Sequence, residues 1–260
     1  MSATLEQALA WTSWLAALVC AVAAIELWSV RHAWRDAGVF RWSTLRIEYD
    51  TLPRPLRRAL DQLFDGRGFA WVVRLQLGLA LALPWWSHPL PAWGLVATTL
   101  ACSVRFRGSY NGGSDAMTMV VLLGLAIART RTSWAELGLA YIAAQLVLSY
   151  FIAGVAKLAD RRWRDGTALP ALLSIPQYGV PPRARRALTH ATVRRAAAGG
   201  VLAFECGFPL ALVDATACAL LATVALAFHV ANVALLGLNR FLLAWLAAYP
   251  ALLFWCSRGG

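Results

Sequence analysis

WAELGLAYIAAQLVLSYFIAGVAK, residues 134–157, is a long run of apolar and small residues with charged groups only near its two ends. An α-helix rises 1.5 Å per residue, so a run of this length can cross the roughly 30 Å hydrocarbon core of a bilayer. Runs of similar character recur along the chain. We therefore predict an all-α protein, a polytopic transmembrane helix bundle of about eight spans that forms a single domain over residues 1–260. The spans are expected at residues 8–30, 68–86, 90–104, 115–128, 134–157, 196–213, 215–236 and 241–255.

The composition of the chain agrees with lipid surroundings. Hydrophobic residues make up 60% of the chain and charged residues 14%, whereas about 25% of a typical soluble domain is charged. A water-soluble protein of this composition could not cover its surface with polar groups. This excludes an ordinary cytosolic enzyme, a disordered chain and a small disulfide-rich scaffold. The first expected partner is therefore the lipid bilayer itself.

The net charge of +11 first suggests nucleic acid as a partner, but the positions of the charges argue against it. Of the 24 basic residues, 20 lie in segments 31–67, 105–114 and 157–195 or at Arg240, between the apolar runs. Basic loops stay on the cytoplasmic side of a membrane. We expect a multi-pass protein of a bacterial inner membrane with both termini outside. The stretch PLRRALDQLF, residues 55–64, predicts a short amphipathic helix on the membrane surface.

Lys157 is the only lysine of the chain and ends one of the apolar runs. At about 100° per residue it shares a helical face with Tyr150 and Gly154, and Gly154 would let another helix or a flat ligand approach closely. A partly desolvated amine loses its proton more readily and can act as a base. The alternative is an interfacial lysine that reaches water and pairs with Asp160. Because the chain uses arginine for every other cation, both interpretations are retained.

Three further ionisable residues lie inside predicted spans, where charged groups are costly: Glu205, His229 and Arg74. Glu205 precedes Pro209, which cannot donate to the Glu205 carbonyl and should kink the helix. Glu205 either lines a polar pocket or forms a structural pair with Arg74 or His229. His229 shares a face with Asn232, and both are candidate pocket residues, although such residues often only hydrogen-bond between helices.

Neither a metal site nor a disulfide framework is expected. The cysteines are odd in number and irregular in spacing, and a metal at His229 would need more ligands nearby. The five cysteines are Cys20, Cys102, Cys206, Cys218 and Cys256. The glycine-rich turn RFRGSYNGGSD, residues 105–115, could present backbone N–H groups to an anion, though most such turns are only connectors.

Three segments together resemble the transmembrane domain of the vitamin K-dependent gamma-carboxylases, known in bacteria as the HTTM (horizontally transferred transmembrane) family. They are YFIAGVAKLADRRWRDG (150–166), AFECGFPLALVD (203–214) and FHVANVALLGLNRFLLAWLAAYPALLF (228–254). SYNGGSD (109–115) occupies the place of a fourth family motif. The resemblance implies that Lys157 matches the lysine that deprotonates a vitamin K-like hydroquinone, and that His229 matches the family's membrane histidine.

Two departures bear on the activity. Asn111, Gly112 and Gly113 stand where the carboxylases carry a histidine, and the lumenal substrate-binding domain is missing from this sequence. Both departures argue against glutamate carboxylation, while quinone-type redox chemistry stays open. One hypothesis is a quinone-linked oxidoreductase or peptide-modifying enzyme with Lys157 and His229 as catalytic residues. Tyr150, Gly154, Asn111, Glu205 and Asn232 would bind substrate or cofactor. The other is a non-catalytic membrane subunit for maturation, export or immunity of a small secreted peptide, with a maturation protein as partner.

Overall fold

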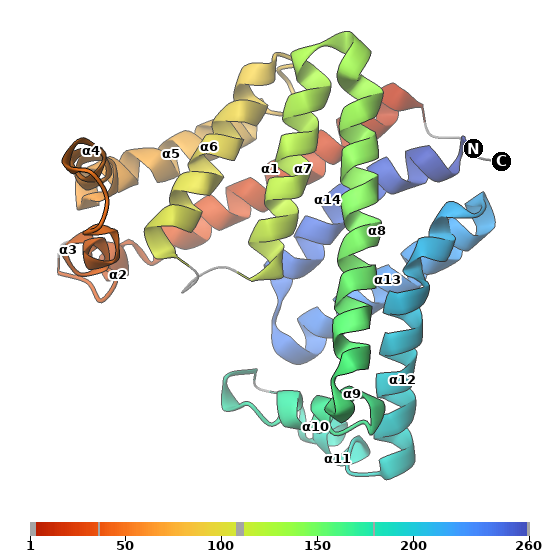
Figure 1. Ribbon diagram of the computed structural model, residues 1–260. Helices are drawn as coiled ribbons and strands as arrows, with labels where there is room; N and C mark the ends of the chain where they lie inside the picture. Colours follow the sequence, from red (N-terminus) through yellow and green to blue (C-terminus); the bar gives the residue numbers. More distant parts are fainter. Residues whose placement is uncertain (1–3, 36, 108–111, 179, 259–260) are drawn as a thin grey trace.

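The computed structural model of the protein describes residues 4–35, 37–107, 112–178 and 180–258 (Figure 1). All regular secondary structure in these ranges is helical, which confirms the predicted all-α bundle. A long helix lies at each of the predicted spans. They are α1 (Leu5–Ser29), α5 (Gly66–Ala82), α6 (Pro89–Phe106), α7 (Gly113–Thr130), α8 (Ala135–Ala159), α12 (Ala191–Gly207), α13 (Ala215–Leu236) and α14 (Asn239–Cys256).

Not all of these helices are long and apolar enough to cross a membrane. Among the described residues six are: α1, α7, α13, α14, α8 with the preceding 3-10 turn η2 (Thr132–Trp134), and α12 with the following turn η4 (Phe208–Leu212). Helix α5 is 17 residues long and carries Arg67 and Arg74. The expected number of spans is therefore approximate, because α5 and α6 contribute to the bundle without meeting the length and hydropathy of the other six.

Local sequence signals set the ends of the outermost helices. Thr4 and Gln7 form a capping box at the start of α1, since each side chain accepts a hydrogen bond from the other residue's backbone N–H. Asp214 caps α13 by accepting from the backbone N–H groups of Thr216 and Ala217 at 2.7 and 2.9 Å. Gly237 ends α13 with a φ of 69°, a conformation that glycine adopts without strain.

The helices cross around α14. Figure 1 shows α7 and α8 side by side, with α1 and α14 passing behind them, and α12 beside the lower part of α8. Helix α14 packs against α1, α7, α8 and α13. In the apolar stretch of α14 half of the residues are buried, whereas in the apolar stretch of α13 only 11% are buried. Helix α13 is thus the least buried of the six, and the core lies along α14.

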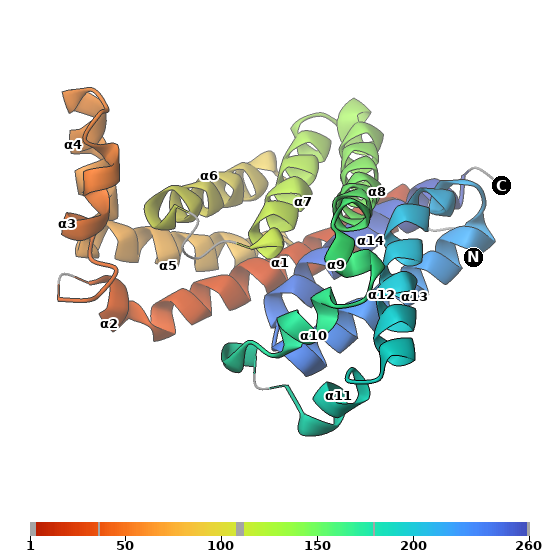
Figure 2. The ribbon, with the colours of Figure 1, turned by 60° about the horizontal axis from the view of Figure 1, so that its bottom comes forward.

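Two basic segments lie at the left edge and at the bottom of Figure 1, whereas the turns before α6, α8 and α13 lie at the top and right. The first comprises α2 (Arg31–Trp34), α3 (Trp42–Leu45), η1 (Arg46–Tyr49) and α4 (Arg54–Phe64). The second comprises α9 (Arg161–Arg164), α10 (Ala168–Leu173), η3 (Pro176–Tyr178) and α11 (Pro182–Ala187). Figure 2 separates them, with α3 and α4 at one side and α10 and α11 toward the viewer. Helix α4 confirms the helix predicted at residues 55–64.

The placement of Arg105 in the glycine-rich turn after the span 90–104 is wrong, because it lies within α6. Its side chain is 1% exposed and lies against the rings of Phe69 and Phe106, at 4.5 and 5.2 Å from their centroids. It donates hydrogen bonds to the backbone carbonyls of Trp34 and Phe40, at 2.8 and 3.2 Å. Because α6 continues through Arg105, this cation is carried into the aromatic cluster that joins α5 and α6 to the first basic segment.

Candidate functional site

Lys157 and Glu205 form an ion pair between α8 and α12. The Nζ atom donates to both carboxylate oxygens, at 2.7 Å to Oε1 and 2.6 Å to Oε2. The Glu205 side chain is 3% exposed and that of Lys157 is 24% exposed. The carboxylate is therefore sealed behind the lysine, and the amine is the member of the pair that a molecule from outside can reach. The ring of Trp163 lies 5.4 Å from Nζ and covers part of the opening.

Tyr150, Gly154 and Lys157 all face α12, as their spacing predicts. A methyl group at Gly154 would lie 2.7 Å from the backbone nitrogen of Cys206 and 2.9 Å from the carbonyl carbon of Glu205. Glycine thus lets the two helix backbones meet at the level of the ion pair. Of the two roles expected for Gly154, close helix approach is confirmed, and a ligand lying on this residue is excluded because α12 fills the space.

The turn of chain after Glu205 follows from Pro209. The α-helical part of α12 ends at Gly207, and the chain continues as the 3-10 turn η4. Phe208 donates its N–H to the Glu205 carbonyl, which Pro209 cannot do. The predicted irregularity after Glu205 is confirmed, in the form of a tightened last turn. It places Phe208 under the ring of Tyr150, with centroids 4.1 Å apart.

A chain of hydrogen bonds runs through the core next to the ion pair. The Tyr150 hydroxyl is 2.6 Å from His229 Nε2 and 3.1 Å from the Tyr249 hydroxyl. These three residues come from α8, α13 and α14, and all three are buried. Phe204 precedes Glu205 in sequence, and its ring lies 5.2 Å from that of Tyr150, so the chain and the ion pair are neighbours.

Aromatic rings enclose His229. The centroids of Phe241, Trp245 and Phe228 lie 4.9, 5.2 and 5.3 Å from that of the imidazole. The other ring nitrogen, His229 Nδ1, and the indole Trp245 Nε1 are both buried without a hydrogen-bond partner in the described part of the chain. Buried polar atoms normally have partners, so this pair of atoms marks a place where a small polar group would be stabilised.

Other sequence expectations have different outcomes. Asn232 is half-buried and lines a separate cavity among leucines of α10 and α13. Asn111 falls outside the described residues. Neither alternative partner proposed for Glu205 is correct, since Lys157 takes that place and Arg74 lies over the rings of Trp28 and Trp71. The alternative pairing of Lys157 with Asp160 is also wrong, because Asp160 is bound by Arg162 at 2.8 Å.

The sequence analysis did not identify Tyr249 or Trp245 as candidate site residues. It also missed a second, half-buried ion pair, in which Arg240 donates to Asp115 and lies 3.7 Å from Glu26. A signal for the latter existed. Arg240 stands alone between two apolar helices, and an isolated cation at such a position needs a buried partner.

The cysteine expectation needs one correction. Cys218 near the start of α13 and Cys256 at the end of α14 form a disulfide, with Cα atoms 6.3 Å apart. Their long sequence separation gave no signal, and only the antiparallel packing of α13 and α14 brings them together. Cys20, Cys102 and Cys206 are free thiols. Among the described residues, no group of three or more His, Cys, Asp or Glu side chains could hold a metal ion.

Comparisons of this chain with protein families, with curated proteins and with solved structures find no match.

Proposed function

We propose that this chain is a quinone-linked membrane oxidoreductase or peptide-modifying enzyme in which Lys157 is the base. One observation carries the proposal: the only lysine of an arginine-rich chain is held by both oxygens of a buried glutamate and is still 24% exposed. An arginine would serve an anchoring role equally well, whereas only lysine can give up its proton and take another.

The pair explains how a charged lysine could act as a base. Lys157 Nζ and Glu205 Oε2 are 2.6 Å apart, so a proton can pass along this hydrogen bond to the carboxylate. The result is a neutral carboxylic acid and a neutral amine. A poorly hydrated site stabilises the charged pair less than water does, so the neutral pair costs less to form there. The Lys157 amine, on the open side, then accepts a proton from a substrate hydroxyl while Glu205 holds the first proton.

A quinone-type group is the substrate class that we propose for this site. Such a group supplies a weakly acidic hydroxyl and two reducing electrons, and its flat ring needs aromatic neighbours and hydrogen bonds at two oxygens. Trp163 provides an aromatic ring 5.4 Å from Lys157 Nζ, whereas Trp245 and Phe241 pack against each other beside His229 with ring centroids 4.1 Å apart. His229 Nδ1 and Trp245 Nε1 are buried and have no hydrogen-bond partner in the described part of the chain. The Tyr150 hydroxyl is hydrogen-bonded to the other imidazole nitrogen, His229 Nε2.

The test is Lys157→Arg, with oxidation of a reduced naphthoquinone under O2 as the readout in detergent-purified protein. The variant keeps the charge and the contact with Glu205, so it should fold and insert normally. Its turnover should fall by about 10²–10⁴-fold, the usual contribution of general acid–base catalysis. Arg164→Lys exchanges the same two residue types on the exposed surface nearby and should keep wild-type turnover. Near-wild-type turnover of Lys157→Arg would show that Lys157 is only an interfacial anchoring residue and not the base.

A second function, a non-catalytic membrane subunit that binds a peptide or a maturation protein, is favoured by the tight closure at Gly154. There the ion pair can serve as a cross-link between α8 and α12. An organic extract of the purified wild-type protein separates the two functions. A quinone present at about one per chain supports the enzyme. Its absence, together with no quinone turnover, supports the subunit.

We further propose that the two basic segments face the cytoplasm and that both termini lie outside. The Cys218–Cys256 disulfide joins the ends of α13 and α14 that point away from the basic segments, and disulfides persist in oxidising compartments. After replacement of the three free cysteines, Arg185→Cys should resist an impermeant thiol reagent in intact cells and Arg258→Cys should react. Labelling of the 185 site would reverse the topology.

A further inference from the structure

A two-part cavity lies between the second basic segment and the ends of α12 and α13. One part has a volume of about 290 Å³ and is lined almost wholly by leucine and alanine, including Leu172 and Leu235. The other, of about 350 Å³, is lined by hydroxyl groups and by Arg185 and Arg194. Leu173 and Leu188 line both parts, so the apolar and the polar halves are continuous.

The polar half selects for negative charge. Arg194 Nε is buried without a partner in the described part of the chain, and Arg185 is exposed at the rim. The segment 157–195 holds nine basic residues and two acidic ones, Asp160 and Asp165. Of these, Asp160 is occupied by Arg162, and Asp165 accepts hydrogen bonds from Thr167, which together with Arg161 and Arg194 lowers the pKa of its carboxyl. Positive charge is therefore left in excess around the opening.

The apolar half opens toward the lipid. It is bounded by the last turn of α13, the helix with the smallest buried share, and by Ala197 on the exposed side of α12. An occupant thus needs a negatively charged head for the arginines and an apolar tail that can enter from the bilayer. We propose that this cavity binds one anionic phospholipid, with its phosphate on Arg185 and Arg194 and an acyl chain along Leu172 and Leu235. Basic pockets at the cytoplasmic ends of membrane helices have this chemistry.

This inference does not depend on the chemistry proposed for Lys157. The cavity is lined by none of Lys157, Glu205 and His229. The experiment is native mass spectrometry of the full chain in a non-ionic detergent, titrated with dioleoyl phosphatidylglycerol or dioleoyl phosphatidylcholine. One phosphatidylglycerol should bind per chain, more tightly than phosphatidylcholine.

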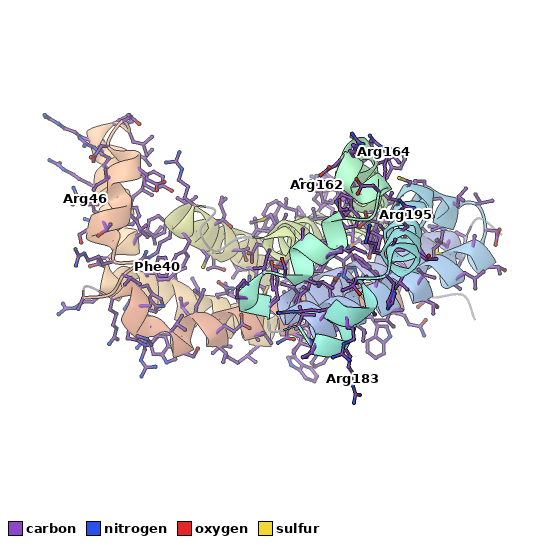
Figure 3. The ribbon with its side chains drawn as sticks, turned by 90° about the horizontal axis from the view of Figure 1, so that it is seen from below. Phe40, Arg46, Arg162, Arg164, Arg183 and Arg195 are labelled. Atoms are coloured by element: carbon purple, nitrogen blue, oxygen red, sulfur yellow. A yellow bond between two sulfur atoms is a disulfide. The ribbon has the colours of Figure 1, made fainter. Side chains whose placement is uncertain are left out.

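The chain offers a matched control for the charge. Figure 3 shows Arg183 pointing away from the ribbon, and neither it nor Arg186 lines the cavity. The double variant R185Q/R194Q should weaken phosphatidylglycerol binding by about 30-fold, since each basic residue near an anionic head group contributes about fivefold. R183Q/R186Q removes the same charge and should change binding less than about twofold. Ala197→Phe fills the apolar half and should weaken binding of both lipids.

Three results would overturn the proposal: equal affinity for the two lipids, equal loss in both double variants, or full displacement of phosphatidylglycerol by millimolar inorganic phosphate. The first two would mean that the arginines act only through the net charge of the segment. The third would make the cavity a site for free anions. The phosphatidylcholine titration controls for folding, since a folded R185Q/R194Q should keep its weaker binding of phosphatidylcholine through the apolar half.

Discussion

Lys157 and Arg105 both place a cation inside the helical bundle, but they meet different partners there. Lys157 is bound by both oxygens of the Glu205 carboxylate. Arg105 is held by two backbone carbonyls and by aromatic faces, and no carboxylate in the described part of the chain pairs with it. The first arrangement has a proton that can move between two groups, whereas the second has none, because neither carbonyls nor aromatic rings accept a proton and arginine does not release one.

The difference separates a site suited to chemistry from a site suited to structure. Guanidinium is weakly hydrated and stacks on rings, so its burial at Arg105 costs less than burial of an ammonium group would. Ammonium is strongly hydrated and needs a charged partner inside a protein. The chain uses each cation where its chemistry fits, and four experiments can test this contrast.

The largest expected effect is on stability after removal of one partner of the ion pair. Lys157→Met leaves Glu205 buried and unpaired, and the free energy of unfolding should fall by about 3–5 kcal/mol. The double variant Lys157→Met/Glu205→Leu removes both charges and should recover to within about 1 kcal/mol of wild type. Equilibrium unfolding in mixed micelles measures both. If the single variant is as stable as the double one, the pair is not closed in solution.

At Arg105 the shape of the cation, more than its charge, should matter. Arg105→Lys keeps the charge but loses the planar fork that reaches the carbonyls of Trp34 and Phe40. We expect a loss of about 2–3 kcal/mol in unfolding free energy, because hydrogen bonds of a charged group are lost in a buried place. Arg58→Lys on the exposed face of α4 is the control and should be neutral. Equal stability of both variants would contradict the role given to the guanidinium.

Close helix approach at Gly154 should matter only for the Lys157 side of the comparison. Gly154→Ala forces apart the backbones of α8 and α12 and should cost about 1–2 kcal/mol. Gly199 lies on α12 with no neighbour within 4 Å of an added methyl group, so Gly199→Ala should be neutral or slightly stabilising. The same unfolding assay applies. A neutral Gly154→Ala would show that the helices can separate without strain.

The smallest effect concerns an ion pair in water. Arg162 holds the pKa of the Asp160 carboxyl below its ordinary value, mainly through their side-chain hydrogen bonds. The contribution to stability is therefore present above pH about 4 and is lost as the pH falls through the lowered pKa. A ¹³C titration of the Asp160 carboxyl should show a midpoint below about 3.9 in wild type and a higher midpoint in Arg162→Gln, in which the backbone N–H of residue 162 still donates to the carboxylate. An unchanged midpoint would show that the surface pair is not formed.

The sequence predicted the helices because apolar runs and caps are local. It also placed Tyr150, Gly154 and Lys157 on one face, since helical spacing fixes the angle between them. It could not choose the partner of Glu205, because that depends on which helices pack together. The same limit hid the disulfide, the Arg240–Asp115 pair and the burial of Arg105, each of which joins residues far apart along the chain.

A chain with one lysine has one ε-ammonium group, and here that group is fixed against Glu205 by two hydrogen bonds. Isotopic labelling with ¹⁵N-lysine would therefore place a single side-chain resonance in the NMR spectrum of the whole protein, with no assignment needed. Its chemical shift distinguishes an ammonium from an amine. The protonation state of Lys157 Nζ can thus be followed directly while the pH is changed or a quinone or lipid is added.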